Sequence, residues 1–335
     1  MSSAFAQSAL LAADAEQDNS LPFRGSTFTF NQTISANAFS KSTQLSYNPQ
    51  YLWGFSLALR WYLNQLFSLG VGQGLQIELT ESDYTTSSQQ PLLTDTAFLF
   101  DARVLKARLS EHQTFNVHGQ AILTAPTSIA SQAATMTLGT QANVVGVFTL
   151  EDWLEGVGFG IELSYLHRFL RSNTLHADTP YPCYTGGSSW NSCQALGSIT
   201  NTRDAFSFAV LSDMSVTTRL ALHFVGEYGW YKAAPLADAS FTTSTGMVIT
   251  LPDESLTHWR NTRYLELGVS YDLFAWLGLG FWISDLFSER GFDAKIRAPL
   301  VPADTAFGLR ALFTLDELYL AISGKRTVTA GPVKP

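Results

Sequence analysis

Residues 51–80 of the chain read YLWGFSLALRWYLNQLFSLGVGQGLQIELT, and this stretch decides the fold. Its first half alternates between two kinds of side chain. The large apolar members are Trp53, Phe55, Leu57, Leu59 and Trp61, and the small or charged members between them are Gly54, Ser56, Ala58 and Arg60. A repeat of two residues over this length predicts a β-strand, because successive side chains of a strand point to opposite faces.

The second half repeats this alternation after a very short turn. Bulky apolar residues such as Phe67, Leu69 and Val71 alternate with Gly70 and Gly72. In a soluble β-sandwich the large apolar face is packed inside and the charged face is outside. Here the small and ionisable face suits a crowded interior, so we expect the apolar face to meet a medium other than water. This is typical of a strand in a transmembrane β-barrel.

The composition of the whole chain supports this interpretation. Only 14% of the 335 residues are charged and 13% are aromatic, whereas soluble proteins average about 25% charged residues. No window reaches the roughly 18 unbroken apolar residues that a transmembrane helix needs. A closed barrel is the remaining way to cross a membrane, since all its backbone groups pair internally. The net charge of −8 argues against nucleic acid as a partner.

The same apolar–polar alternation recurs in further segments along the chain. The connections between these segments are short and long in turn. Short turns are expected near 64, 111, 153, 217, 275 and 316, and longer loops lie between them; residues Phe241 to Leu251 could form a small hairpin within one loop. Barrels of bacterial outer membranes have even strand numbers, so the sequence predicts an all-β, antiparallel, up-and-down barrel of about 12 strands, with about 14 as the alternative. Thirteen segments are candidate strands, so either the first or the last is not a membrane strand, which gives 12, or one more strand is present, which gives 14. The candidates are 26–39, 50–63, 66–82, 93–109, 113–126, 137–150, 156–171, 204–216, 218–232, 259–274, 277–288, 304–315 and a short last one at 317–325.

At this point the pattern resembles Gram-negative outer-membrane β-barrel proteins of the porin-like class. The resemblance covers residues 26–325 and depends on alternation, aromatic strand ends and loop asymmetry, so it indicates no specific family. It implies a location in the outer membrane with membrane lipid as a partner.

Residues 1–25 are expected to be the remainder of a signal peptide or a flexible segment, because Ala4-Phe5-Ala6 before Gln7 fits a cleavage site. Residues 326–335 are expected to be a tail.

Two cysteines, Cys183 and Cys193, lie in the longest polar connection. Their closeness in one loop suggests a disulfide and an oxidising compartment, and two unpaired thiols are the alternative. We predict no metal site and no cofactor.

Ionisable residues on the predicted inner face are the candidate functional residues. They either cross-link the barrel wall as hydrogen-bonded pairs or line an aqueous passage and set its selectivity. Counted from the short turns, Asp101 is expected just above mid-membrane and Arg60 just below it. Inward acids outnumber inward arginines, which favours cations if a pore is open. The predicted lumen-lining residues are Arg60, Glu78, Asp101, Arg103, His118, Glu162, His223, Glu227, Glu266 and Arg310.

The function favoured by the sequence is a narrow channel for small polar solutes or cations. The alternatives are a structural or docking subunit of an envelope complex with a closed lumen, and a transporter of hydrophobic compounds. A lipid hydrolase is the least favoured. Outer-membrane phospholipases use a histidine two residues before a serine, and none of the histidines here, including His167, has that spacing. We therefore expect no enzymatic activity.

Overall fold

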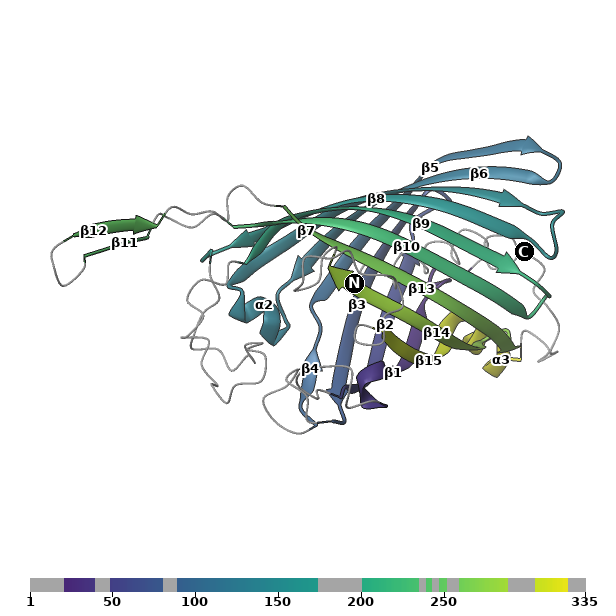
Figure 1. Ribbon diagram of the computed structural model, residues 1–335. Helices are drawn as coiled ribbons and strands as arrows, with labels where there is room; N and C mark the ends of the chain where they lie inside the picture. The colour runs from purple at the N-terminus through teal and green to yellow at the C-terminus, as the bar shows by residue number, and fades with distance from the viewer. Residues whose placement is uncertain are drawn as a thin grey trace.

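The computed structural model describes residues 21–39, 49–80, 89–173, 201–234, 239–242, 247–251, 259–288 and 305–324. Over these residues the chain forms a closed antiparallel β-barrel (Figure 1). The ring of hydrogen-bonded neighbours runs β1, β2, β3, β5, β6, β7, β8, β9, β10, β13, β14 and β15, and β15 pairs with β1 to close it. The described part of the sheet has 13 strands, and β4 pairs only with β3, so the prediction of a 12-strand ring is confirmed.

The strands of the ring agree with the alternating segments of the sequence. Each one is long enough to cross a membrane when tilted, which takes about 9–11 residues. Their bounds are β1 Thr27–Ser35, β2 Tyr51–Tyr62, β3 Phe67–Glu78, β5 Thr96–Ser110, β6 Gln113–Ala125, β7 Met136–Leu150, β8 Val157–Leu170, β9 Thr202–Ser215, β10 Leu220–Ala233, β13 Trp259–Phe274, β14 Leu277–Ser288 and β15 Thr305–Thr314.

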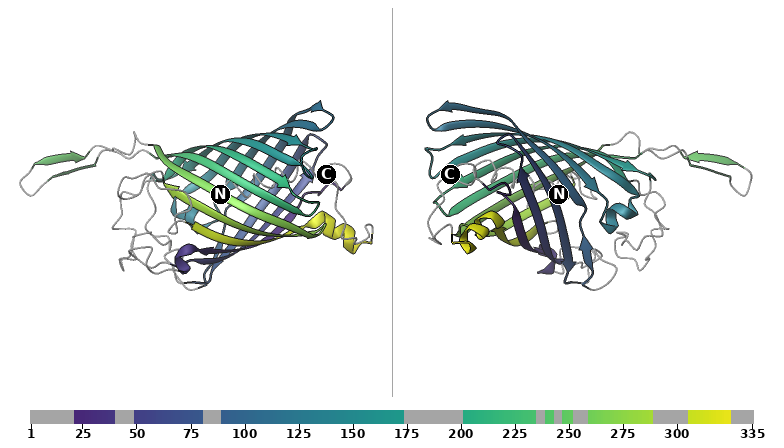
Figure 2. Two further views of the ribbon diagram at one scale, coloured as in Figure 1. Left: turned by 45° about the vertical axis from the view of Figure 1, so that its right-hand side comes forward. Right: turned by 180° about the vertical axis from the view of Figure 1, so that it is seen from behind.

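The remaining elements lie at the two ends of the barrel. Helix α3 lies at the end with the short turns, while α2 and the β11–β12 hairpin lie at the opposite end (Figures 1 and 2). The hairpin, Ala239–Leu251, overlaps the predicted stretch Phe241 to Leu251 and begins two residues before it. These elements are β4 Pro91–Leu93, β11 Ala239–Thr242, β12 Val248–Leu251, the 3-10 helix η1 Ala36–Ala38, α2 Ile129–Ala133 and α3 Leu315–Ile322.

The expected thirteenth strand at 317–325 is wrong. Residues Leu315–Ile322 form α3 instead, after the last strand of the ring has ended at Thr314. Thr314 is the N-cap residue, and Asp316 and Glu317 lie in the first turn, where negative charge favours a helix N-terminus. The helix ends before Gly324, whose φ of 67° suits glycine. No helix in the described ranges is long and apolar enough to cross a membrane.

The apolar side chains point out of the barrel, as the alternation in the sequence predicts. In β8 the outward residues Ile161 and Leu163 are 53% and 45% exposed, whereas the inward residues Glu162 and Ser164 between them are 4% and 6% exposed. Trp53 and Leu57 of β2 and Leu267 of β13 are also exposed. A soluble protein would reverse this distribution, so the outer surface is built for hydrocarbon.

One irregularity separates β4 from β5. On β3, Gly72 pairs with Ala97 of β5 and Leu75 pairs with Leu93 of β4. Three residues, Thr94 to Thr96, therefore face two residues of β3, Gln73 and Gly74, and form a bulge. Thr94 lies against Gly74, where an added Cβ would come within 2.9 Å of Thr94 Oγ1. The bulge therefore requires glycine at this point of β3.

A second glycine makes room for an aromatic ring. The indole of Trp282 on β14 lies directly over Gly308 on β15, where any Cβ would overlap it. We expect Gly308→Ala to destabilise the barrel by about 1–3 kcal/mol through overpacking, measured by urea unfolding in detergent or lipid. Gly158→Ala is the control, since its Cβ would meet nothing closer than Asp213 O at 4.0 Å. Equal stability of the two variants would contradict this packing.

Candidate functional site

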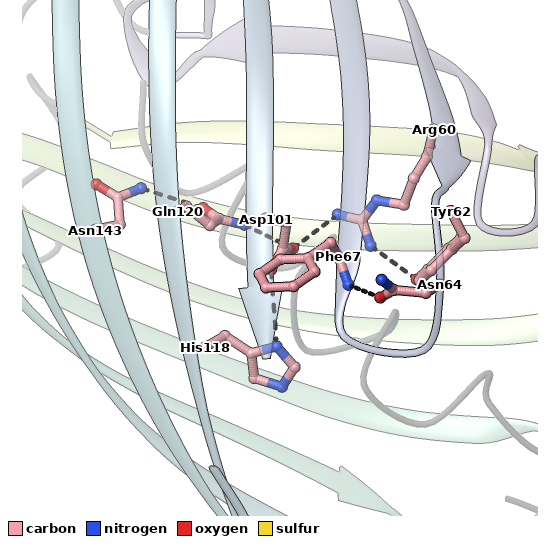
Figure 3. A network of polar contacts seen from close by, with 8 residues as sticks. All are labelled: Arg60, Tyr62, Asn64, Phe67, Asp101, His118, Gln120 and Asn143. Atoms are coloured by element: carbon pink, nitrogen blue, oxygen red, sulfur yellow. Dashed lines mark hydrogen bonds and ion pairs between the residues drawn. The ribbon is translucent and has the colours of Figure 1, made fainter. Parts of the chain in front are cut away.

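Asp101 lies at the centre of a polar network on the inner face of the barrel (Figure 3). Its Oδ2 lies 3.5 Å from Nη2 of Arg60 on β2 and accepts a hydrogen bond from Nε2 of Gln120 at 3.4 Å. Its Oδ1 lies 3.8 Å from Nδ1 of His118, two residues before Gln120 on β6. The side chains of Arg60 and Asp101 are each only 12% exposed, so this ion pair is largely shielded from water.

The network continues around the wall through amides. Asn143 Nδ2 on β7 donates to Gln120 Oε1 at 3.3 Å. Gln141 Nε2 donates both to Asn143 Oδ1 at 2.9 Å and to Ser164 Oγ on β8 at 3.0 Å. Hydrogen bonds and one ion pair thus connect β2 to β8 along the inner face. The sequence predicts Arg60, Asp101 and His118 as lumen residues but omits the amides, because neutral side chains carry no charge signal.

The register of β2, β3 and β5 brings Arg60 and Asp101 together. Counting from the short turns placed them on opposite sides of mid-membrane, yet their charged groups are in contact. The register explains this result: Ser68 of β3 pairs both with Tyr62 on β2 and with Asp101 on β5. Strands of a barrel are tilted and staggered, so residues equally far along neighbouring strands do not lie at equal depth.

Three of the predicted acids are almost completely buried. Glu78 is 1%, Glu162 4% and Glu266 4% exposed. Glu78 accepts a hydrogen bond from the Thr80 hydroxyl at 3.1 Å, and Glu266 accepts one from the Tyr264 hydroxyl. Each of these carboxyl groups is packed into the inner wall.

The remaining predicted residues lie elsewhere on the inner face. His223 Nδ1 lies 2.7 Å from Asp213 Oδ1 on the neighbouring strand β9. Arg310 Nε donates to Asn31 Oδ1 at 3.1 Å across the seam between β15 and β1. In the backbone register, Arg103 on β5 lies opposite His118 on β6. Glu162 on β8 and Glu227 on β10 both lie opposite Ala209 of β9, the strand between them.

Asp95, in the bulge between β4 and β5, anchors the segment that leads into α2. Its Oδ1 accepts the backbone N–H of Ser128 at 2.9 Å, and its Oδ2 accepts the Ser131 hydroxyl. Ser128 is itself the N-cap of α2, with its side chain accepting the Ser131 N–H. The bulge at Thr94 to Thr96 therefore places a carboxylate where it holds the start of α2.

His167 lies on the outward alternation of β8, two residues after Tyr165. Its Nδ1 is 2.7 Å from Asp204 Oδ1, which also accepts a hydrogen bond from the Tyr165 hydroxyl at 3.0 Å. Tyr165 is 48% exposed on the face that meets lipid. An aromatic and ionisable group of this kind is typical of the membrane–water interface.

Cys183 and Cys193 lie outside the described residues, so the disulfide stays a prediction. Among the described residues, no three His, Cys, Asp or Glu side chains form a group that could hold a metal ion.

A closed ring of antiparallel strands with an exposed apolar outer face and an ionisable inner face defines an outer-membrane β-barrel of the Gram-negative type. It is similar in fold to solved outer-membrane channels. The COG4313 outer membrane channel from Pseudomonas putida F1 has a TM-score of 0.48 and 12% identity, over 89% of this chain and 99% of that one. The NanC porin has a TM-score of 0.42 and 7% identity, over 86% and 98%. The KdgM porin has a TM-score of 0.36 and 7% identity, also over 86% and 98%.

No protein-family model matches the chain, and no curated protein matches it either. At the identities above, the likeness to these channels concerns the barrel fold alone.

Proposed function

We propose that this protein is a narrow channel that passes small hydrophilic solutes and ions across the outer membrane. The observation that carries the proposal is the character of the inner face near the middle of β2. Ser56 points inward by alternation, and it is exposed, whereas few other inward residues of the ring are. Its neighbour Leu57 is exposed on the outward face, which meets lipid. A small hydroxyl accessible to water within a closed ring supports a wet lumen beside β2.

The polar network supports the same proposal. Ionisable groups at membrane depth belong either in a wet interior or in mutual pairs. Asp101, Arg60 and His118 are paired and shielded, so they fix the wall from β2 to β6. The amides of Gln120, Asn143 and Gln141 extend this wall to β8. A rigid wall beside Ser56, which water can reach, is the arrangement that a size-selective pore needs.

Liposome swelling tests whether the lumen is open. We expect purified protein in liposomes to admit sugars and amino acids at rates that fall as the solute becomes larger. Empty liposomes provide the baseline. No swelling with any solute would contradict the channel and favour a docking subunit with a closed lumen, whereas uptake restricted to apolar compounds would favour a hydrophobic-compound transporter.

A larger side chain in place of Ser56 should narrow the passage through the lumen. We expect Ser56→Trp to reduce single-channel conductance by about half or more, because an indole adds volume where water now has access. Leu57→Trp is the matched control, since the neighbouring side chain is 40% exposed on the lipid side. An undiminished conductance in Ser56→Trp would place the passage elsewhere.

A further inference from the structure

Trp282 on β14 lies flat against the inner wall of the barrel instead of pointing across the lumen. A Cβ added to Gly308 on the neighbouring strand β15 would overlap three adjacent atoms of the indole, Cε2, Cζ2 and Nε1. Overlap with adjacent ring atoms means that a face of the indole, and not an edge, covers Gly308. Nε1 is buried and has no hydrogen-bond partner among the described residues, so packing orients the ring.

The face of the indole turned away from Gly308 is open to the lumen. Trp282 is partly exposed, although one of its faces and Nε1 are covered. The exposed part therefore lies on the opposite face and the outer edge of the ring. Because Trp282 is an inward residue of a closed ring of strands, this surface meets the lumen and not lipid.

A glycine also flanks the indole on its other side. Trp282 lies opposite Gly268 of β13 in the register. A Cβ added to Gly268 would lie 3.1 Å from Cδ2 of His223 and 3.5 Å from Cβ of Trp282, so the imidazole stands beside the indole side chain. Nδ1 of His223 lies 2.7 Å from Oδ1 of Asp213, which holds the imidazole in place. Glycine on both neighbouring strands thus allows an aromatic surface to form along the wall.

The inner face around the indole is mostly small and neutral. Thr33 of β1 lies opposite Gly308. Several of the neighbouring side chains carry hydroxyl or amide groups, which hydrogen-bond with polar solutes. The neutral inward residues two positions along the same strands are Asn31, Ser35, Ser270, Gly280, Ser284 and Ala306. Small residues leave room above the exposed face of the ring.

Charged side chains of both signs flank the indole. The charged inward residues two positions along the same strands are Arg310 and Glu266. Arg310 donates through Nε to Asn31 Oδ1 at 3.1 Å, and Glu266 is only 4% exposed. Asp272 lies farther along β13 and is exposed. Neither sign of charge prevails here, so the aromatic face is the feature that distinguishes this part of the wall.

A solute that fits this surface has a flat face with C–H groups and hydroxyl groups around its rim. The face of an aromatic ring is negative and attracts hydrogens that carry a partial positive charge. The ring form of a sugar presents C–H groups on its faces, while its hydroxyl groups point outward, toward groups such as those of Thr33 and Asn31. A planar apolar compound would displace water from these groups without replacing its hydrogen bonds, which costs free energy.

We propose that Trp282 is a stacking platform for the ring of a neutral sugar inside the lumen. The inference rests on the proposed channel function and names one class of solute for it. Passage through a channel needs binding that is favourable enough for entry and weak enough for release. A single aromatic face on the wall provides weak binding of this kind.

Block of the ion current by glucose in a planar bilayer tests the proposal, with sorbitol as the comparison. Sorbitol has nearly the same size and hydroxyl groups, but it is an open chain without a flat ring face. We expect glucose to block the wild-type channel at a concentration about threefold or more below that of sorbitol, the factor that one stacking contact supplies. Trp282→Leu should remove this difference, and Trp282→Phe should keep part of it, because phenylalanine retains an aromatic face.

Trp53→Leu is the matched control. Trp53 lies on the outward alternation of β2 and is 36% exposed, so the same substitution there leaves the lumen unchanged. Heat-modifiable migration on gels shows that each variant is folded. Equal block of the wild type by glucose and sorbitol, or an unchanged difference in Trp282→Leu, overturns the sugar site while leaving a channel; an absence of any ion current overturns the channel function itself.

Discussion

Ile161→Arg is expected to lower the free energy of unfolding of the barrel by about 2–4 kcal/mol, the cost of a cation facing hydrocarbon near the middle of the bilayer. Ile161 lies in the central part of β8 and is 53% exposed on the outward face. The arginine cannot leave the hydrocarbon by turning inward, because Gly160 and Glu162 on either side are buried in the wall. Urea unfolding in phospholipid vesicles measures the change.

Thr218→Arg is the control for this substitution. Thr218 is exposed in the turn between β9 and β10, at the edge of the barrel. The cost of arginine falls to about 0–1 kcal/mol near the interface. If both variants lost the same stability, the depth assigned to β8 would be incorrect.

Asp101→Ala is expected to cost about 3–5 kcal/mol, the penalty for removing one partner of a buried ion pair. The substitution leaves the Arg60 guanidinium, His118 and the Gln120 amide without the carboxylate that they share. The same unfolding measurement applies. Asp101→Asn keeps the shape and part of the hydrogen bonding, so it should cost less than Asp101→Ala.

A double-mutant cycle separates the ion pair from the rest of the network. If Arg60 and Asp101 stabilise each other, Arg60→Ala combined with Asp101→Ala should cost less than the sum of the two single variants. Additive costs, or a loss below about 1 kcal/mol in Asp101→Ala, would be typical of an exposed and weakly coupled pair, and would contradict the network.

The strands could be predicted closely from the sequence because lipid on one side and packed protein on the other impose a strict alternation. β14 is predicted at 277–288 and forms over Leu277–Ser288. The error at 317–325 came from a short apolar run that fits strand and helix equally well. The spacing of Thr314 and Glu317 is typical of a helix start and could have indicated α3.

The candidate site was only partly predictable. Alternation shows that Arg60, Asp101 and His118 face inward, but contacts between them depend on the register and stagger of the strands, which alternation does not fix. The accessibility of the charged side chains around the ring is likewise not fixed by alternation. A count of inward acids treats every carboxylate alike, whereas the fold buries Glu78, Glu162 and Glu266 and leaves Asp272 exposed.

The orientation of neighbouring residues on β2 tests the central claim most directly. Nitroxide labels can be attached to Ser56→Cys and to Leu57→Cys after Cys183 and Cys193 are replaced by serine, and their collision rates with oxygen and with a water-soluble nickel chelate measured in lipid vesicles. We predict that the label at position 57 collides mainly with oxygen in the hydrocarbon and the label at position 56 mainly with the chelate. The reverse pattern, or the same pattern at both positions, would contradict a barrel with an apolar exterior and a wet lumen.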